Sequence, residues 1–153
     1  MPSASLDLLV LAGALAWAAP LAAQHGKELG IQAIVTGSDP ALGVIGVYGA
    51  IRTSTRTRAS LTAGPGVSDG NLAFRGEALG HFLLSPGQRR GAAFYLAGGV
   101  AAVAGPVDRG YLVLALGLEA RPGGESGWGA ELGVGGGVRL MLGYRWRWLQ
   151  ATR

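Results

Sequence analysis

The final apolar segment of the chain, residues 140–148, alternates strictly between two kinds of side chain. One set is bulky and apolar and consists of Leu140, Leu142, Tyr144, Trp146 and Trp148. The intervening residues are Met141, Gly143, Arg145 and Arg147. Successive side chains of a β-strand point to opposite faces, so this pattern predicts a strand between two different environments. Large apolar residues on one face, with Gly and Arg on the other, are typical of a strand with lipid outside and a polar lumen inside.

The first part of the chain has the features of an export signal. Residues 8–19 form a short apolar segment, and small residues follow Pro20. This arrangement predicts a cleaved secretory signal peptide over residues 1–23, which leaves residues 24–153 as a single domain. A membrane anchor fits less well because the apolar run is shorter than about 20 residues and ends at Pro20. The segment before the apolar core has Asp7 and no Lys or Arg, which departs from the usual basic start.

Composition excludes several classes of protein. The sequence has no cysteine, so it has neither a disulfide framework nor a thiolate metal site. The formal net charge is +4, but the arginines are spread singly along the predicted strands, which argues against a nucleic-acid partner. Beyond the signal segment, the longest apolar run covers residues 92–104. That run is too short for a helix across a bilayer, although it suits a tilted strand of about 9–11 residues.

Gly, Pro, Asp and Ser divide residues 24–153 into eight segments of strand length. The predicted strands cover residues 28–37, 41–53, 56–64, 71–84, 91–104, 109–121, 127–134 and 138–149. One continuous strand over residues 128–148 is the alternative for the last two, but it exceeds what a bilayer needs. Strands in lipid cannot leave an open edge, because each unpaired backbone group there costs several kcal/mol. The sequence therefore predicts an all-β fold, a closed eight-stranded antiparallel up-and-down transmembrane β-barrel.

The last strand also carries a resemblance to a known family. The segment from Gly143 to Trp148 is similar to the Gly-x-x-aromatic-x-aromatic signal that the barrel assembly machinery reads in outer-membrane proteins. Residues 27–148 as a whole resemble the small eight-stranded outer-membrane barrels of the OmpA/OmpX type. The resemblance implies a bacterial outer-membrane location, with membrane lipid and the assembly machinery as partners and no cofactor. Met141 departs from the signal, which prefers a polar residue there, and residues 149–153 extend beyond the strand.

Charged and polar side chains share strand faces with Gly and Ala, and these faces are predicted to line the lumen. The candidate lumen residues are Arg58, Arg75, Glu77, His81, Glu119, Glu131, Arg139, Arg145 and Arg147. The interior of an eight-stranded barrel is just wide enough for side chains to fill, and unpaired buried charges are costly. The mixture of signs thus predicts a structural ionic network that plugs the barrel.

Two sets of partners are expected within this network. Glu77 is predicted to lie opposite Arg58 and close to Arg75, because a loop over residues 64–70 would bring positions 58 and 77 level. At the closing seam, Glu28 is predicted to approach Arg145 or Arg147.

Aromatic residues gather near one end of the predicted barrel. The expected belt consists of Phe82, Phe94, Trp128, Trp146 and Trp148. Aromatic rings of this kind anchor membrane proteins at the level of the lipid headgroups. Only Phe74 stands out at the opposite end.

Catalytic and metal-binding alternatives have weaker support. His81 has Glu77 and Ser85 four residues to either side, but on a strand this spacing separates the groups by about 13 Å. His81 is therefore interpreted as a structural lumen residue. The glycine-rich run at residues 133–137 lacks the Lys-Ser/Thr pair of a phosphate-binding loop. No cluster of Asp, Glu, Cys or His with metal-ligand spacing is present, so neither a metal nor a cofactor is expected.

The sequence thus predicts a non-enzymatic outer-membrane protein of a Gram-negative envelope, with a structural or envelope-stabilising role. The alternatives are a narrow, porin-like channel for small solutes and an outer-membrane lipid-modifying enzyme. A soluble exported barrel that binds a small apolar ligand fits worst, because it requires large apolar residues inside. The outer connections, predicted at residues 37–40, 64–70, 105–108 and 135–137, are short, which disfavours a receptor or an adhesin.

Overall fold

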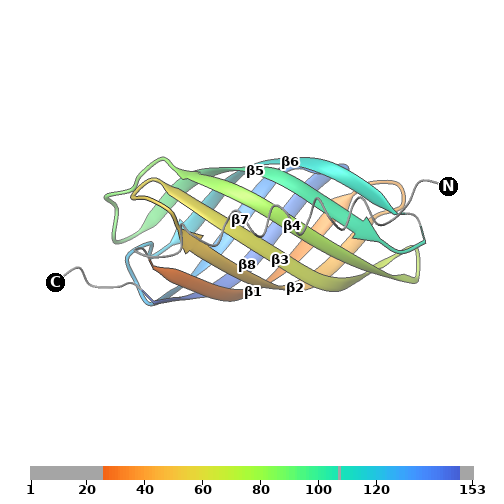
Figure 1. The fold of residues 1–153 in the computed structure, drawn as a ribbon, viewed down its shortest axis with the longest axis horizontal. Coiled ribbons are helices and arrows are strands. Elements are labelled where there is room, and N and C mark those ends of the chain that lie inside the picture. The colour runs from red at the N-terminus through yellow and green to blue at the C-terminus, as the bar shows by residue number, and fades with distance from the viewer. Residues whose placement is uncertain (1–25, 107, 149–153) are drawn as a thin grey trace.

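The computed structural model describes residues 26–106 and 108–148, and this part of the chain folds into eight β-strands and no helix (Figure 1). The strands are β1 (Lys27–Gly37), β2 (Leu42–Arg52), β3 (Thr57–Ser68), β4 (Asn71–Leu83), β5 (Ala92–Ala104), β6 (Arg109–Ala120), β7 (Ser126–Val134) and β8 (Val138–Trp148). Among the described residues, no helix is long and apolar enough to cross a membrane. The predicted signal segment, residues 1–23, lies outside the described residues.

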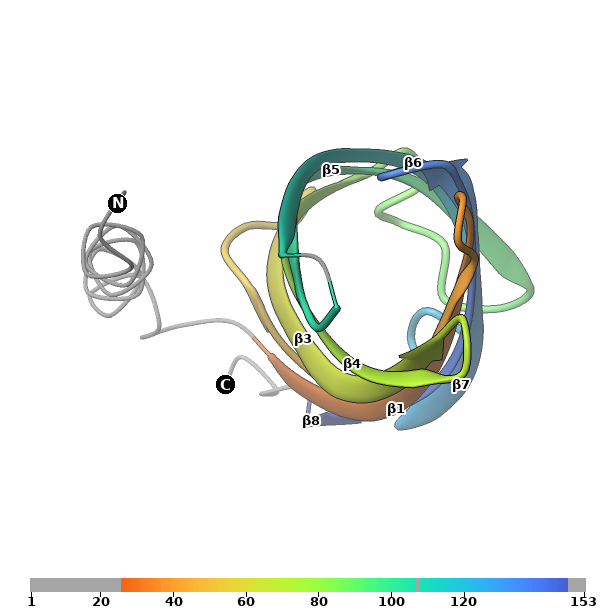
Figure 2. The same ribbon diagram turned by 90° about the vertical axis from the view of Figure 1, so that its right-hand side faces the viewer.

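The sheet closes on itself. Each strand pairs with the next in antiparallel fashion, and β1 also pairs with β8 from Lys27–Trp148 to Gly37–Val138. Figure 2 shows the resulting ring in a view along the barrel. Closure gives every strand two hydrogen-bonded neighbours and leaves no edge strand. The predicted eight-stranded antiparallel up-and-down barrel is therefore confirmed.

The two ends of the barrel differ in their connections. The terminus end, defined here as the end where β1 starts and β8 finishes, has connections at residues 53–56, 84–91 and 121–125. The opposite end has four connections, each of two to four residues. One of them is the three-residue turn after β7, where Gly136 and Gly137 have positive φ. The hairpin placed at residues 135–137 is therefore confirmed, and the single long strand is excluded.

The third strand is longer than predicted, and this corrects the loop expected at residues 64–70. β3 continues to Ser68, and only Asp69 and Gly70 connect it to β4. Both have positive φ, 50° and 74°, as a tight two-residue hairpin turn requires. Asp-Gly is a strong sequence signal for such a turn, so the turn could have been found from the sequence.

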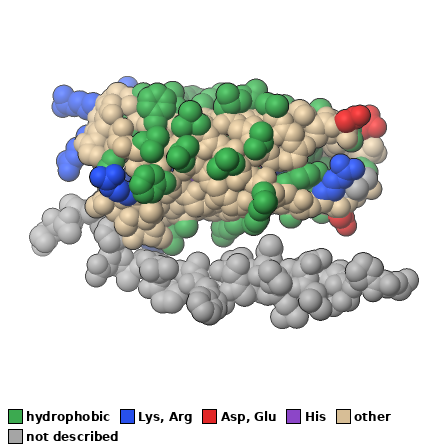
Figure 3. All heavy atoms as spheres, turned by 90° about the horizontal axis from the view of Figure 1, so that it is seen from above, with side chains coloured by type: hydrophobic (Ala, Val, Ile, Leu, Met, Phe, Trp, Pro, Cys, Tyr) green, Lys and Arg blue, Asp and Glu red, His purple; other side chains and the backbone are tan. Residues whose placement is uncertain are grey.

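Side chains alternate between the wall and the lumen along every strand. Leu, Ile, Val, Phe and Trp side chains cover the outside, as in Leu112, which is 81% exposed. Charged side chains of the strand interiors point inward and are buried. Every exposed charge among residues 26–106 and 108–148 lies at an end of the barrel, and the wall between the ends carries none. Figure 3 shows this for one face.

β2 and β3 approach each other closely near Pro65. Their ladder pairs Leu42–Ser68 to Val44–Gly66 and resumes at Val47–Ala63. Proline has no N–H to donate, which explains the interruption. Beside it, a Cβ atom on Gly64 would clash with the backbone of Ile45. Gly64 is therefore needed for its lack of a side chain.

We expect Gly64→Ala to destabilise the barrel by about 1–3 kcal/mol, because the added methyl group would force the two strands apart. Gly49→Ala is the matched control on the neighbouring strand, where an added Cβ meets nothing within 4 Å. The measurement is urea unfolding of the refolded protein, followed by tryptophan fluorescence. Equal stability of the two variants would contradict the close approach.

Candidate functional site: an ionic core inside the barrel

The structure places all nine candidate lumen residues inside the barrel. The relative exposures of Arg58, Arg75, Glu77, His81, Glu119, Glu131, Arg139, Arg145 and Arg147 range from 0 to 3%. Glu28 is equally buried, at 4%. These side chains come from β1, β3, β4, β6, β7 and β8. They form two clusters, one toward each end of the lumen.

The Glu77 cluster, on the side of the opposite end, contains Arg75, Glu77, Glu131 and Arg139. Glu77 accepts hydrogen bonds from Arg75 Nε at 2.8 Å and from Arg139 Nε and Nη2 at 3.0 and 2.7 Å. Arg139 Nη1 also donates to Glu131 Oε2 at 2.7 Å. Two carboxylates face two guanidinium groups, so the formal charges of this cluster balance.

The Glu119 cluster lies nearer the terminus end and contains Glu28, Arg52, Arg58, Glu119, Arg145 and Arg147. Arg58 Nη1 donates to Glu119 Oε2 at 2.9 Å and lies 3.3 Å from Glu28 Oε2. Arg145 Nη1 and Arg147 Nη2 lie 3.6 and 3.4 Å from the same Glu119 oxygen. Here two carboxylates are shared among four guanidinium groups.

Two buried tyrosines contact the clusters, and the sequence analysis did not identify them; one of the two, Tyr95, links the clusters to each other. Tyr95 donates from its hydroxyl to Glu131 at 2.7 Å and accepts from Arg145 Nη2 at 2.9 Å. The guanidinium of Arg145 also stacks over the ring of Tyr48, 4.6 Å from its centroid. Such cation–π contacts stabilise positive charge that the carboxylates do not balance. Tyr95 was missed because β5 is apolar on both faces, which left its inward face undecided.

The expected pairing of Arg58 with Glu77 is wrong. In the ladder between β3 and β4, Arg58 lies level with His81, and Glu77 lies level with Thr62. The two-residue turn at Asp69–Gly70 sets this register, whereas the expected longer loop would have shifted it by four residues. Arg58 instead reaches the Glu119 cluster.

The other expected partners are close together. Glu77 contacts Arg75 on its own strand. Glu28 lies level with Arg147 across the seam between β1 and β8, and Arg147 Nε lies 3.8 Å from Glu28 Oε1.

His81 has a serine partner in the lumen, but its geometry is wrong for nucleophilic catalysis. His81 Nε2 lies 2.8 Å from Ser60 Oγ, while Nδ1 lies 3.4 Å from Arg58 Nη2. A guanidinium can only donate, so Nδ1 accepts and Nε2 carries the proton. The imidazole thus donates to Ser60 and cannot take its proton as a general base. Ser85, the serine considered from the sequence, follows β4 in the connection to β5.

The five belt residues lie on the outside of the barrel near the terminus end. Phe82, Phe94, Trp128, Trp146 and Trp148 are 43–59% exposed. Tyr144 packs edge-on between two of them, with ring centroids 5.0 Å from Trp128 and 5.2 Å from Trp146. These three rings therefore form a continuous aromatic surface across β7 and β8.

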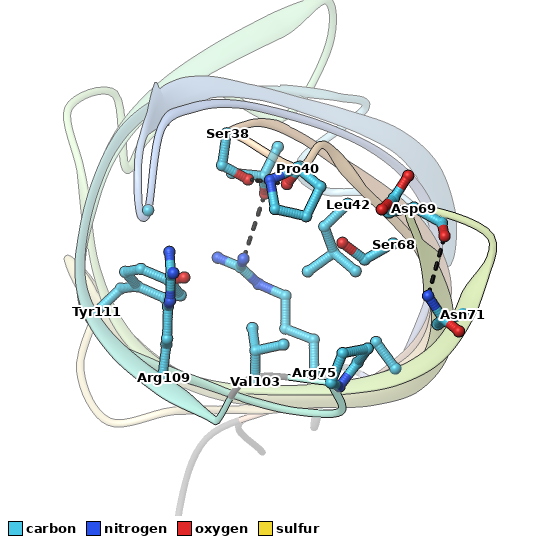
Figure 4. Close-up of a pocket in the computed structure, with 14 residues that line it drawn as sticks. Ser38, Pro40, Leu42, Ser68, Asp69, Asn71, Arg75, Val103, Arg109 and Tyr111 are labelled. Atoms are coloured by element: carbon cyan, nitrogen blue, oxygen red, sulfur yellow. Dashed lines mark hydrogen bonds between the residues drawn. The ribbon is translucent and has the colours of Figure 1, made fainter.

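A cavity of about 230 Å³ opens at the opposite end of the barrel. Arg75 extends into it and donates from Nη1 to Thr36 Oγ1 at 3.2 Å (Figure 4). Arg75 belongs to the Glu77 cluster, so the cavity reaches the ionic core. Across residues 26–106 and 108–148, no group of three or more His, Cys, Asp or Glu side chains is arranged to hold a metal ion.

Comparison with known proteins supports the fold. No protein-family profile matches the sequence, and no curated protein matches it. Among solved structures, the chain is similar to the N-terminal β-barrel domain of Pseudomonas aeruginosa OprF, with a TM-score of 0.65. The similarity covers 82% of this chain and 98% of that domain, at 14% sequence identity. The chain therefore shares the fold of that β-barrel domain.

A double-mutant cycle on Glu77 and Arg139 tests the ionic core. We expect Glu77→Leu alone to cost about 3–5 kcal/mol, because Arg75 and Arg139 lose their carboxylate. Adding Arg139→Met should recover about 1–3 kcal/mol of this loss as coupling energy, since the uncompensated charge leaves too. The measurement is the free energy of unfolding in urea.

The control is the same cycle on Arg58 and Glu77, which share no partner. Their effects should add to within about 0.5 kcal/mol. Strong coupling in this control, or none between Glu77 and Arg139, would contradict the observed contacts.

Proposed function

We propose that the protein is a non-enzymatic, structural β-barrel of the bacterial outer membrane, with its lumen closed by the ionic core. The observation that carries this proposal is the distribution of charge. The wall is apolar and carries no exposed charge among the described residues, while ten strongly buried ionic or imidazole side chains lie inside. A protein surrounded by water places most of its charged side chains on the surface, which is the opposite arrangement.

The dimensions of the barrel fit a bilayer. The strands are 9–13 residues long, close to the 9–11 residues that a tilted strand needs to cross the hydrocarbon core. Closure of the sheet pairs the backbone N–H and C=O groups of every strand with those of a neighbouring strand. A lipid environment requires this because it offers these groups no water as a partner. The aromatic belt lies where one lipid–water interface would fall. The last-strand signal and the predicted signal peptide support export, lipid contact and recognition by the barrel assembly machinery.

The arrangement of ion pairs supports a closed lumen. β4 and β8 are four strands apart in the ring of eight and therefore face each other across the lumen. The Glu77–Arg139 contact joins these two strands at 2.7 Å. The Arg58–Glu119 contact similarly joins β3 to β6 at 2.9 Å. Side chains that meet across the lumen at two levels narrow any water path through it, which supports a plug over a channel.

Substitution of one wall residue tests the membrane proposal. Leu114, in the middle of β6, and Leu72, at the start of β4, are 63% and 64% exposed. We expect Leu114→Arg to destabilise the barrel in lipid vesicles by about 2–4 kcal/mol, and Leu72→Arg by at most about 1 kcal/mol, because the cost rises toward the bilayer midplane. The measurement is the folded fraction in urea titrations in vesicles. Equal tolerance of both variants would indicate a wall that faces water.

Conductance tests the plug. We expect planar-bilayer recordings of the purified, folded protein to show no steady open current, because the two clusters bridge the lumen. The control is the paired variant Arg58→Ala/Glu119→Ala, which removes one bridge while keeping the remaining charge balance. A steady current from the unmodified protein would favour the channel alternative.

A further inference from the structure

Exposed charges are mostly positive at one end of the barrel and mostly negative at the other. At the terminus end, the exposed charged residues are Lys27, Arg56, Arg89, Arg90, Arg121 and Glu125. At the opposite end they are Asp39, Asp69, Asp108 and Arg109. In Figure 3, most of the blue side chains accordingly lie at the left end, and the red ones lie at the right end with some blue beside them. The ionic core does not account for this asymmetry, because none of these side chains takes part in it.

Three of the arginines line a pocket at the terminus end. The β4–β5 and β6–β7 connections form an open, shallow pocket of about 430 Å³, lined by Arg89, Arg90, Gly91, Arg121, Gly123 and Gly124. Within the described part of the chain, the guanidinium groups of Arg89, Arg90 and Arg121 form no salt bridge. The pocket thus concentrates three positive charges with no carboxylate among its lining residues.

The backbone holds this pocket in shape. Arg121 N donates to Gly91 O at 2.8 Å, and Gly123 N donates to Arg89 O at 3.2 Å, which ties the two connections together. From inside the barrel, Arg147 Nη1 donates to Arg121 O at 3.0 Å. Because the main chain is fixed by these contacts, the three arginines project from neighbouring positions before any ligand arrives.

The pocket lies just beyond the aromatic belt. Arg90 precedes Phe94 by four residues, and Arg121 lies three residues beyond Leu118, the partner of Phe94 in the β5–β6 ladder. At about 3.3 Å per residue, these two arginines lie on the order of 10 Å along the strands beyond the ring of Phe94. Belt rings occupy the interface, so in a membrane these arginines reach the level of the lipid phosphates.

We propose that this pocket binds the phosphate of an anionic phospholipid headgroup in the leaflet at the terminus end. The inference rests on the proposed membrane location. Guanidinium groups match phosphate oxygens through paired N–H donors, and clustered arginines favour anionic over zwitterionic lipid. The acidic opposite end offers no comparable site, so binding is confined to one leaflet.

The test uses the full chain refolded in nanodiscs of phosphatidylcholine with increasing phosphatidylglycerol, with bound lipid counted by native mass spectrometry. We expect phosphatidylglycerol to be retained preferentially. Arg89→Gln/Arg90→Gln/Arg121→Gln should weaken this preference on the order of 100-fold, about fivefold for each charge removed. Arg109→Gln, which removes an exposed arginine from the opposite end, is the matched control and should leave the preference unchanged.

Three results would overturn the proposal: no preference for phosphatidylglycerol, an equal loss in the Arg109→Gln control, or displacement of the lipid by millimolar inorganic phosphate, which would indicate a site for free anions. Failure here is distinguishable from failure of the proposed function. A protein that folds into phosphatidylcholine bilayers without selecting anionic lipid retains its membrane role and loses only this site.

Discussion

Carboxylates buried in the lumen hold the barrel together across its width, and the rest of the structure depends on them. Glu77 and Glu119 each contact arginines from other strands, so every such contact spans a part of the ring that backbone hydrogen bonds do not join. A buried charge without a partner is strongly destabilising. The arginines can therefore occupy the lumen only because these carboxylates contact them. Because the charged side chains lie in the lumen, the outer wall can consist of apolar side chains.

The abundance of glycine follows from the same narrow interior. Large side chains fit inside the barrel only where a neighbouring residue is a glycine and has no side chain. A Cβ atom on Gly117 would collide with the ring of Tyr95, and one on Gly129 would come within 3.1–3.5 Å of the Arg145 guanidinium. Tyr95 and Arg145 in turn connect the two charged clusters. Glycine in the strands is thus part of the packing of the ionic core, in addition to its role in turns.

Much of the fold could be predicted from the sequence, because alternation over a strand has a period of two and identifies each face without knowledge of the neighbouring strands. Contacts across the lumen could not, since they depend on register and on closure of the whole ring. Misplacing one turn by a few residues was enough to pair Arg58 with the wrong carboxylate. Tyr95 was hidden because β5 offers no polar residue to mark its inward face.

On the proposed membrane location, the unequal connections have a consequence for how the barrel enters a bilayer. Polar backbone must cross the hydrocarbon region once during insertion, and the barrier to that passage grows with the number of unpaired groups carried across. For insertion led by the opposite end, only turns of two to four residues make the crossing. The longer connections and most of the exposed arginines then stay on the side from which the barrel enters. The distribution of polar groups between the two ends thus favours one direction of insertion.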